Sequence, residues 1–184
     1  DPAGIEDLIM GCAFPEGEQG FNVARIVGLL SDLPISVAGV TVNRFCGSSM
    51  QSIHFAAGAI QMNAGDAFIC AGVESMSRIP MGGYNPMPNA DLYEKNEGAY
   101  MAMGETAENL AVDNQYQREP MDEYALTSQQ RAGAAREFLS RHIAPIEVRE
   151  RKATRMMDED EYPRPQVTLE KLAGMQPVFR DNGM

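Results

Sequence analysis

The chain has 184 residues, of which 44 % are hydrophobic, enough for the core of one domain or of one domain and part of another. Its net charge of −11 argues against nucleic acid or an anionic membrane as the main partner, and no apolar run approaches the roughly 18 residues that would span a membrane. The three cysteines stand far apart, without a CxxC pair or a nearby histidine, which disfavours a disulfide framework or a metal site.

Charge density divides the chain into two parts. Residues 1–90 hold 8 acidic and 3 basic side chains, whereas residues 91–184 hold 18 and 12. The boundary segment 80–91 is rich in Pro, Gly and Asn, which is typical of a linker or long loop. We expect a buried, sheet-containing domain over 1–90 and a solvated, helix-rich domain over 91–184.

The first part alternates between strand-like and helix-like segments. Residues 21–33 place apolar side chains at i, i+3, i+4 and i+7 from Val23, and Pro34 ends the helix that this spacing predicts. Residues 46–65 predict a second helix, which carries almost no charge and should be buried on most of its circumference. Short apolar runs predict strands at 5–14, 36–45 and 66–75. This alternation indicates an α/β layer fold with a parallel sheet.

The second part is dominated by helical patterns. Residues 119–142 predict one long helix, with Pro120 placed in its first turn. Shorter helices are expected at 105–116 and 167–175, and the acidic run 158–161 is expected to lie in a loop.

Cys46 stands where the predicted strand 36–45 gives way to the predicted helix 46–65. Free backbone N–H groups and the positive end of the helix dipole favour a thiolate there, and α/β proteins place ligands at such strand ends. The small residues that follow, Gly47, Ser48 and Ser49, leave room for a substrate. The spacing alone leaves two interpretations open, a nucleophile or a buried structural cysteine.

The other cysteines and the histidines have ordinary interpretations. Cys12 and Cys70 fall in predicted strands, so we expect both in the core. His54 stands roughly 12 Å along the helix axis from Cys46, too far for a direct hydrogen bond, and is interpreted as a packing residue. His142 ends the long helix and is expected to be solvated.

The segment around Cys46 is distinctive. Residues 42–81, VNRFCGSSMQSIHFAAGAIQMNAGDAFICAGVESMSRIPM, closely resemble the acyl-enzyme segment of thiolases. The resemblance continues through MGETAENLA (103–111), DEYALTSQQRA (122–132), IAPIEV (143–148) and RPQVTLEKLAGMQPVF (164–179), and covers essentially the whole chain. It implies a layered α/β/α half with a mostly parallel sheet over 1–90, followed by part of a helix-rich inserted loop domain that binds coenzyme A.

The resemblance implies an acyl-CoA acyltransferase in which Cys46 is the nucleophile. The residues in these segments resemble degradative 3-ketoacyl-CoA thiolases of β-oxidation more than biosynthetic thiolases. In such an enzyme this cysteine carries the acyl group between the substrate and CoA. CoA is then a substrate, and no tightly bound cofactor or metal is expected. The alternatives are a biosynthetic acetoacetyl-CoA thiolase, a decarboxylating β-ketoacyl synthase and a non-catalytic thiolase-like lipid-binding protein.

Four further residues match family positions that line CoA or the acyl group. Met103 matches a methionine beside the acyl group, Arg164 an arginine at the nucleotide end of CoA, and Phe179 an aromatic residue near the pantetheine. Lys171 replaces a small polar residue at another CoA-lining position. Ala102 stands where many biosynthetic members have histidine, which favours a wider acyl pocket.

Several expectations concern the whole protein. Family members also need a histidine, a second cysteine and an oxyanion hole, which come from Asn-Glu, Gly-His-Pro and Gly-rich Cys blocks that do not occur in these residues. We therefore expect the chain to be truncated at both ends and inactive alone. We also expect a homodimer or homotetramer, with a β-oxidation multienzyme complex as a further partner. A bacterial cytoplasmic location is favoured, and mitochondrial and peroxisomal locations stay open.

Overall fold

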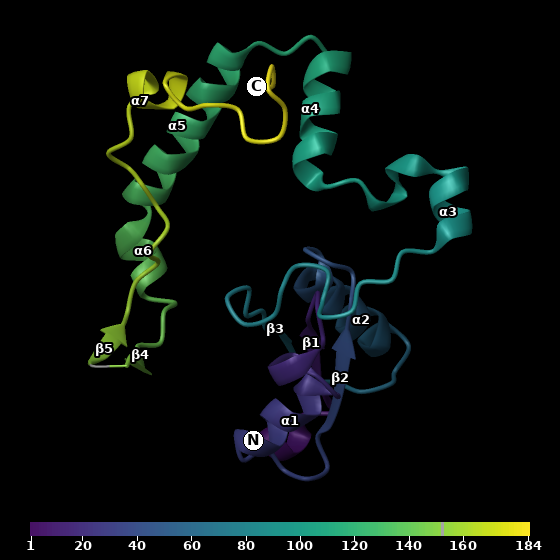
Figure 1. Ribbon diagram of the computed structural model, residues 1–184. Helices are drawn as coiled ribbons and strands as arrows, with labels where there is room; N and C mark the ends of the chain where they lie inside the picture. Colours follow the sequence, from purple (N-terminus) through teal and green to yellow (C-terminus); the bar gives the residue numbers. More distant parts are fainter. Residues whose placement is uncertain (152) are drawn as a thin grey trace. The chain divides into compact units, whose positions relative to one another are not determined.

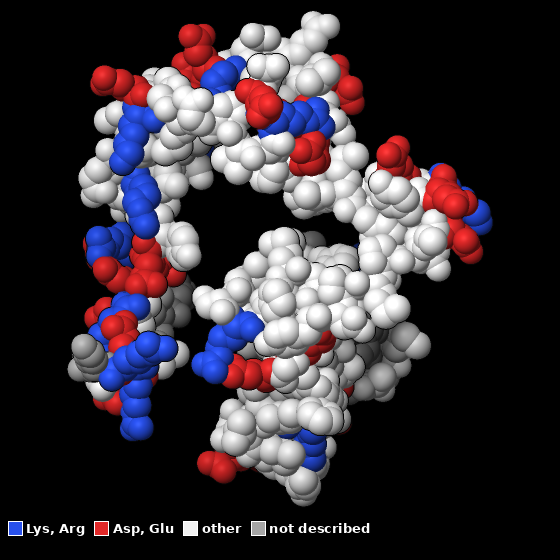
Figure 2. Space-filling view, in the orientation of Figure 1, with Lys and Arg blue, Asp and Glu red and all other residues white. Residues whose placement is uncertain are grey.

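The computed structural model describes residues 1–151 and 153–184, which form two compact units, Asp1–Asn89 and Ala90–Met184 (Figure 1). Among these described residues, no helix is both long and apolar enough to cross a membrane. Charged side chains are sparse over the unit that holds α1 and α2 and crowd along the other unit (Figure 2). The two units therefore differ in the density of charged side chains on their surfaces.

The first unit is built on a three-stranded parallel sheet. Its strands are β1 (Asp7–Gly11), β2 (Ala38–Val42) and β3 (Phe68–Gly72), in the order β2-β1-β3. The register places Ile9 of β1 opposite Val40 of β2 and Cys70 of β3. All three predicted strands and their parallel pairing are confirmed.

Helices connect these strands at the predicted places. The 3₁₀ turns η1 (Pro2–Gly4) and η2 (Gly17–Gln19) precede α1 (Val23–Leu30), and α2 (Ser48–Gln61) joins β2 to β3. α1 begins because the Asn22 side chain accepts a hydrogen bond from the Arg25 N–H at 3.4 Å, which satisfies an unpaired donor of the first turn. The helix ends before Pro34, as its sequence predicts.

The two helices cover opposite faces of the sheet. Alternate residues of a strand point to opposite faces, and Leu8, Met10 and Cys12 form one buried cluster with Val23 and Ala24 of α1. On the other face, the Cys70 thiol lies 3.5 Å from the Ser52 carbonyl of α2. The result is a layered α/β/α arrangement, in agreement with the expected fold class.

α2 is much less buried than its sequence predicts. Its buried residues are Ser48, Ser52 and Ala56, which recur every four positions and make one narrow stripe. Its large apolar residues remain exposed (Met50, Ile53, Phe55 and Ile60). The expectation of burial around most of the circumference is wrong for this chain, because only one sheet face contacts the helix.

The second unit consists mainly of helices. In chain order it contains α3 (Ala90–Lys95), η3 (Glu97–Tyr100), α4 (Met103–Asp113), α5 (Arg118–Ala134), α6 (Arg136–Ser140), β4 (Ile146–Arg149), β5 (Thr154–Met157) and α7 (Leu169–Ala173). The predicted helices 105–116 and 167–175 correspond to α4 and α7. The acidic run 158–161 lies in a loop, as expected.

Two features of the second unit differ from expectation. The helix predicted over 119–142 is interrupted at Ala135, whose ψ of 0° ends α5 before α6 begins. Nearby, Gly133 lies directly against Pro165, a contact for which a larger side chain leaves no room. β4 and β5 form an antiparallel hairpin that pairs Ile146 with Met157, in a region where no strand was predicted.

Polar contacts hold the remaining segments of the second unit in place. Arg118 at the start of α5 forms an ion pair with Asp122 at 2.9 Å and donates to backbone carbonyls at the end of α7. Arg180 donates to Glu105 at 2.7 Å and to Asn109 at 2.6 Å on α4. The segment that follows α7 is thereby attached to α4.

Candidate active site

Three loops meet at the carboxyl edge of the parallel sheet. Ala13 follows β1, Asn43 follows β2 and Glu74 follows β3. The Asn43 side-chain amide donates to the Ala13 carbonyl at 2.9 Å, and the Ala13 N–H donates to the Glu74 carboxylate at 2.7 Å. Carboxyl ends of parallel strands are where α/β proteins bind ligands, so this edge is the candidate active site.

Cys46 lies in a tight turn between β2 and α2, four residues after the strand ends. Phe45 adopts a left-handed backbone with φ of 46°, which a non-glycine residue rarely does. The Ser48 hydroxyl accepts from the Arg44 N–H at 2.8 Å and donates to the Phe45 carbonyl at 2.6 Å. Hydrogen bonds between residues of the turn itself therefore stabilise it, and the Cys46 side chain is exposed to solvent.

The helix that follows Cys46 approaches the sheet closely because two strand ends are glycine. A Cβ added at Gly11 would overlap the backbone of Ser48 and Ser49, and one added at Gly72 would lie 2.8 Å from the Ser49 Cβ. Gly47, the N-cap residue, has no side chain to cap the first turn of α2. The amino-terminal end of a 14-residue helix is therefore directed toward the Cys46 turn.

The three cysteines occupy different environments. Cys12 is 1 % exposed, and burial, together with the nearby Glu74 carboxylate, raises the pKa of its thiol. It is the least suited of the three to act as a nucleophile. Cys70 is exposed, so its assignment to the core is wrong, because no further element among the described residues covers that part of β3. Cys46 is exposed and adjoins a helix end, the environment in which reactive cysteines are found.

Neither histidine belongs to the Cys46 turn. His54 is exposed in the middle of α2, so its interpretation as a packing residue is wrong. His142 follows α6, where it is exposed and its ring lies 5.0 Å from that of Phe138.

Gln19 is a buried polar residue that contacts two loops of the candidate site. It is 3 % exposed, and its amide nitrogen donates to the Phe14 carbonyl at 2.8 Å and to the Glu74 carboxylate at 2.7 Å. Its amide oxygen accepts from the Ser75 N–H. Gln19 therefore joins the loops that follow β1 and β3.

In the second unit, Phe179 packs against the residue that follows Met103 in the chain. The Phe179 ring lies directly on Gly104, the neighbour of Met103 at the start of α4. Phe179 is 52 % exposed and Met103 is 73 % exposed, so both retain surface for a ligand.

Arg164 and Lys171 lie elsewhere in the second unit. The Arg164 guanidinium donates to the carbonyls of Glu161 and Pro163, and its backbone N–H donates to Gln129 of α5 at 2.6 Å. Lys171 is exposed on α7. The described contacts do not join these two side chains to Met103 and Phe179.

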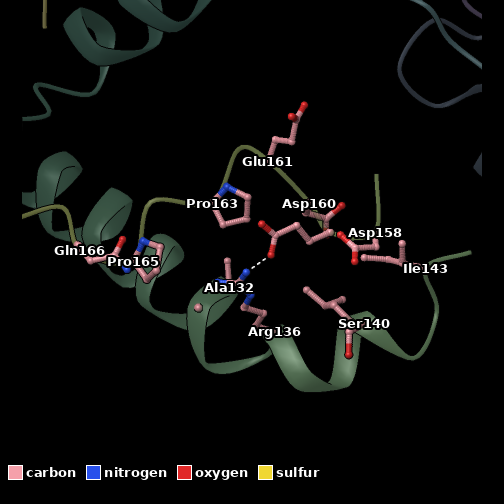
Figure 3. Close-up of a pocket in the computed structure, with 13 residues that line it drawn as sticks. Ala132, Arg136, Ser140, Ile143, Asp158, Asp160, Glu161, Pro163, Pro165 and Gln166 are labelled. Carbon is pink, nitrogen blue, oxygen red and sulfur yellow. Dashed lines mark hydrogen bonds and ion pairs between the residues drawn. The ribbon is translucent and has the colours of Figure 1, made fainter. Parts of the chain in front are cut away.

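A cavity of about 270 Å³ lies between α5, α6 and residues 158–166, and Pro163 and Pro165 line it (Figure 3). Four consecutive acidic residues, 158–161, line it, and Arg136 forms an ion pair with one of them, Glu159. Acidic side chains disfavour a bound phosphate. The cavity is therefore unsuited to the nucleotide end of CoA, and any contact of Arg164 with CoA takes place outside it.

Sequence reasoning did not identify Gln19, Asn43 or Glu74 as part of the site. One signal was available for two of them, because Asn43 and Glu74 are polar residues near the carboxyl ends of the predicted strands 36–45 and 66–75, which share one sheet edge. Gln19 gave no comparable signal, since its burial depends on contacts with loops distant in sequence.

Comparisons with known proteins agree on one family. The model of the family described as "Thiolase, N-terminal domain" matches residues 1–184. The chain is 41 % identical to a 3-ketoacyl-CoA thiolase of Bacillus subtilis, over 97 % of this chain and 49 % of the relative. It is also 41 % identical to a beta-ketoadipyl-CoA thiolase of Escherichia coli, over 98 % of this chain and 50 % of the relative.

Solved structures show the same similarity. Human mitochondrial 3-ketoacyl-CoA thiolase is similar with a TM-score of 0.81 and 35 % identity, over all of this chain and 50 % of that one. The Bacillus anthracis acetyl-CoA acetyltransferase gives a TM-score of 0.81 and 33 % identity with the same coverage. The chain thus spans about half the length of the relatives it matches.

Proposed function

This chain belongs to the thiolase family, and we propose that the protein it comes from cleaves 3-ketoacyl-CoA with CoA, through an acyl group carried on Cys46. The observation that carries the proposal is the exposed thiol of Cys46 at the carboxyl edge of a parallel sheet, adjoining the amino end of α2. The names of the curated relatives support the substrate class.

The proposed reaction has two acyl transfers. The Cys46 thiolate attacks the 3-keto carbon, the bond between carbons 2 and 3 breaks, and carbon 2 takes up a proton to leave as acetyl-CoA. The thiolate of a free CoA then attacks the acyl-cysteine thioester, which releases a shortened acyl-CoA and restores Cys46. The contribution of this chain is the nucleophile, which adjoins the amino end of α2.

The direct test uses the intact protein as the cell makes it. When 3-ketoacyl-CoA and CoA are mixed with that protein, acetyl-CoA and an acyl-CoA two carbons shorter should appear in equal amounts. Without CoA, at most one acetyl-CoA per Cys46 should be released, so continued turnover in its absence would contradict thiolysis.

The opposite direction, condensation of two acetyl-CoA molecules, is the second candidate. The acetyl-CoA acetyltransferase of Bacillus anthracis matches this chain as well in TM-score as the human thiolase does. The small side chain of Ala102 at the N-cap of α4 favours longer acyl groups, and so favours degradation in β-oxidation. Comparing the rates of cleavage of acetoacetyl-CoA and of longer 3-ketoacyl-CoA substrates distinguishes the biosynthetic candidate from the degradative one.

We further propose that Met103, Arg164, Lys171 and Phe179 contact CoA or the acyl group. Met103 begins α4 and Phe179 lies on the adjacent Gly104, and the exposed surfaces of the two side chains support this most directly. Replacing Phe179 with alanine should raise KM for CoA by about 2- to 10-fold, the effect of one lost aromatic contact, with little change in kcat.

The matched control for this prediction is Phe138→Ala. It removes a comparably exposed aromatic ring from α6 in the same unit, since Phe138 is 60 % exposed and Phe179 is 52 % exposed. Steady-state kinetics at varied CoA concentration measure both variants, and an unchanged KM in the Phe179 variant would remove that residue from the proposed contacts.

The exposed apolar surface of the first unit supports a homodimer or homotetramer. α2 exposes four large apolar side chains, and β2 is an edge strand with Val40 partly exposed. Monomeric proteins rarely leave a large contiguous apolar patch uncovered. Light scattering of the intact protein at micromolar concentration should therefore give at least twice the mass of one polypeptide, and a monomer mass would contradict the proposal.

The cellular setting is proposed from the relatives alone. Bacterial curated relatives support a bacterial cytoplasmic enzyme, and the human mitochondrial structure keeps an organellar setting open. A β-oxidation multienzyme complex is the proposed partner. Co-purification from native cells with other acyl-CoA enzymes would test it.

A further inference from the structure

Asn43 uses both ends of its side-chain amide at the Cys46 turn. Its nitrogen donates to the Ala13 carbonyl at 2.9 Å, and its oxygen accepts from the Phe45 N–H at 2.8 Å. The second bond fixes the residue next to Cys46, whose backbone is left-handed. One side chain therefore links the Cys46 turn to the loop that follows β1.

That loop is held in turn from the end of β3. The Ala13 N–H donates to Glu74 Oε2 at 2.7 Å, and Glu74 Oε1 accepts from the buried Gln19 amide at 2.7 Å. Phe14 adds an aromatic contact, with its ring 6.0 Å from that of Phe45. The series Gln19, Glu74, Ala13 and Asn43 is thus a continuous set of hydrogen bonds that ends at the Cys46 turn.

We propose that Asn43 and Glu74 are positioning residues, which fix the Cys46 sulfur in place through the backbone of Ala13. The inference rests on the proposed function for its catalytic readout, and on the observed hydrogen bonds for its geometry. The proposal requires no contact between either residue and the substrate. Their role is to keep Cys46 where attack on the 3-keto carbon is aligned, since a displacement of about 1 Å can cost about 100-fold in rate.

Asn43→Asp is the decisive variant. Aspartate retains the oxygen that accepts from the Phe45 N–H but places a second oxygen against the Ala13 carbonyl, where a donor is needed. The variant should lower kcat by about 10- to 100-fold, with KM for 3-ketoacyl-CoA within about twofold of the original value. Asn43→Ala, which removes both bonds, should lower kcat to a similar extent.

Glu74→Gln tests the other end of the series. Glutamine keeps one acceptor oxygen but turns an NH₂ group toward either the Ala13 N–H or the Gln19 amide. The expected loss in kcat is about tenfold, the effect of one hydrogen bond. If both residues act through Ala13, the Asn43→Asp and Glu74→Gln double variant should be no slower than Asn43→Asp alone.

A second measurement does not depend on thiolysis. Iodoacetamide labelling of the intact protein, followed by peptide mass spectrometry, gives separate rates for Cys46 and for the exposed Cys70. In the Asn43→Asp variant, Cys46 should be labelled about two- to fivefold more slowly because its thiol leaves the helix end, and Cys70 should be unaffected. Asn63→Asp, the same change at the opposite end of α2, is the control and should alter neither rate.

The outcomes separate the two proposals. Slower labelling of Cys46 in an intact protein that shows no thiolysis would support the positioning role and overturn the proposed function. If the Asn43→Asp protein is fully active while the Asn43→Ala protein is impaired, the hydrogen bond from the Phe45 N–H alone is sufficient. That result would overturn the inference, because the bond to the Ala13 carbonyl would then not be needed. Independent, multiplying effects of the Asn43 and Glu74 changes would overturn it as well, because the two residues would then not act through one path.

Discussion

Replacing Cys46 with alanine is expected to lower kcat for thiolysis by on the order of 10⁴- to 10⁶-fold, as loss of the nucleophile does in other enzymes of covalent catalysis. Without the thiol, no acyl-enzyme forms, and neither half of the exchange proceeds. The fold should be unaffected because the side chain is exposed. The free energy of unfolding should change by less than about 0.5 kcal/mol.

Two measurements check this expectation. Stopped-time assays of the intact protein compare Cys46→Ala with Cys70→Ala, which removes an exposed thiol from β3 and should leave the rate unchanged. Mass spectrometry after a brief incubation with acetyl-CoA should locate the acetyl group on the peptide that contains Cys46. An acetyl group on Cys12 or Cys70 would contradict the assignment.

Replacing Gly11 with alanine should lower the free energy of unfolding by roughly 3 kcal/mol, the upper end of the usual cost of overfilling a packed site. The added methyl group would overlap the backbone of Ser48 and Ser49, which cannot move aside as a flexible side chain would. α2 must therefore shift away from the sheet. Because Cys46 lies two residues before that helix begins, turnover should fall by about 100-fold as well.

Urea unfolding and thiolysis of the intact protein measure the two effects of Gly11→Ala separately. Gly4→Ala is the matched control, since a Cβ at Gly4 meets no atom within 4 Å. The control should change stability by less than about 0.5 kcal/mol. A Gly11→Ala protein as stable as the control would show that α2 does not lie against β1 as described.

The fold of the first unit was largely predictable because its segments obey local rules. The helical spacing from Val23 and the stop at Pro34 locate α1, and short apolar runs locate the three strands. The alternation of strands with helices along the chain then predicts a parallel sheet. The position of Cys46 between β2 and α2 follows from the same pattern, but its role as nucleophile came from the resemblance.

Other features depend on contacts that a local pattern does not contain. The close approach permitted by Gly11 is visible only once α2 is placed on the sheet. The hairpin of β4 and β5 was missed because its strands have four residues each and mix charged with apolar side chains. Apolar character predicted burial for Cys70, but burial requires a covering element, and the described residues supply none at that place.

The strand order has a consequence for synthesis on the ribosome. β1 is the central strand, yet its partner β3 is made about 60 residues later, roughly 3 to 12 s at ordinary translation rates. During that interval β1 can pair only with β2, and its other edge stays open to chaperones or to neighbouring chains. Glu74 emerges after β3, so the Cys46 turn is complete only when the last strand of the sheet has been added.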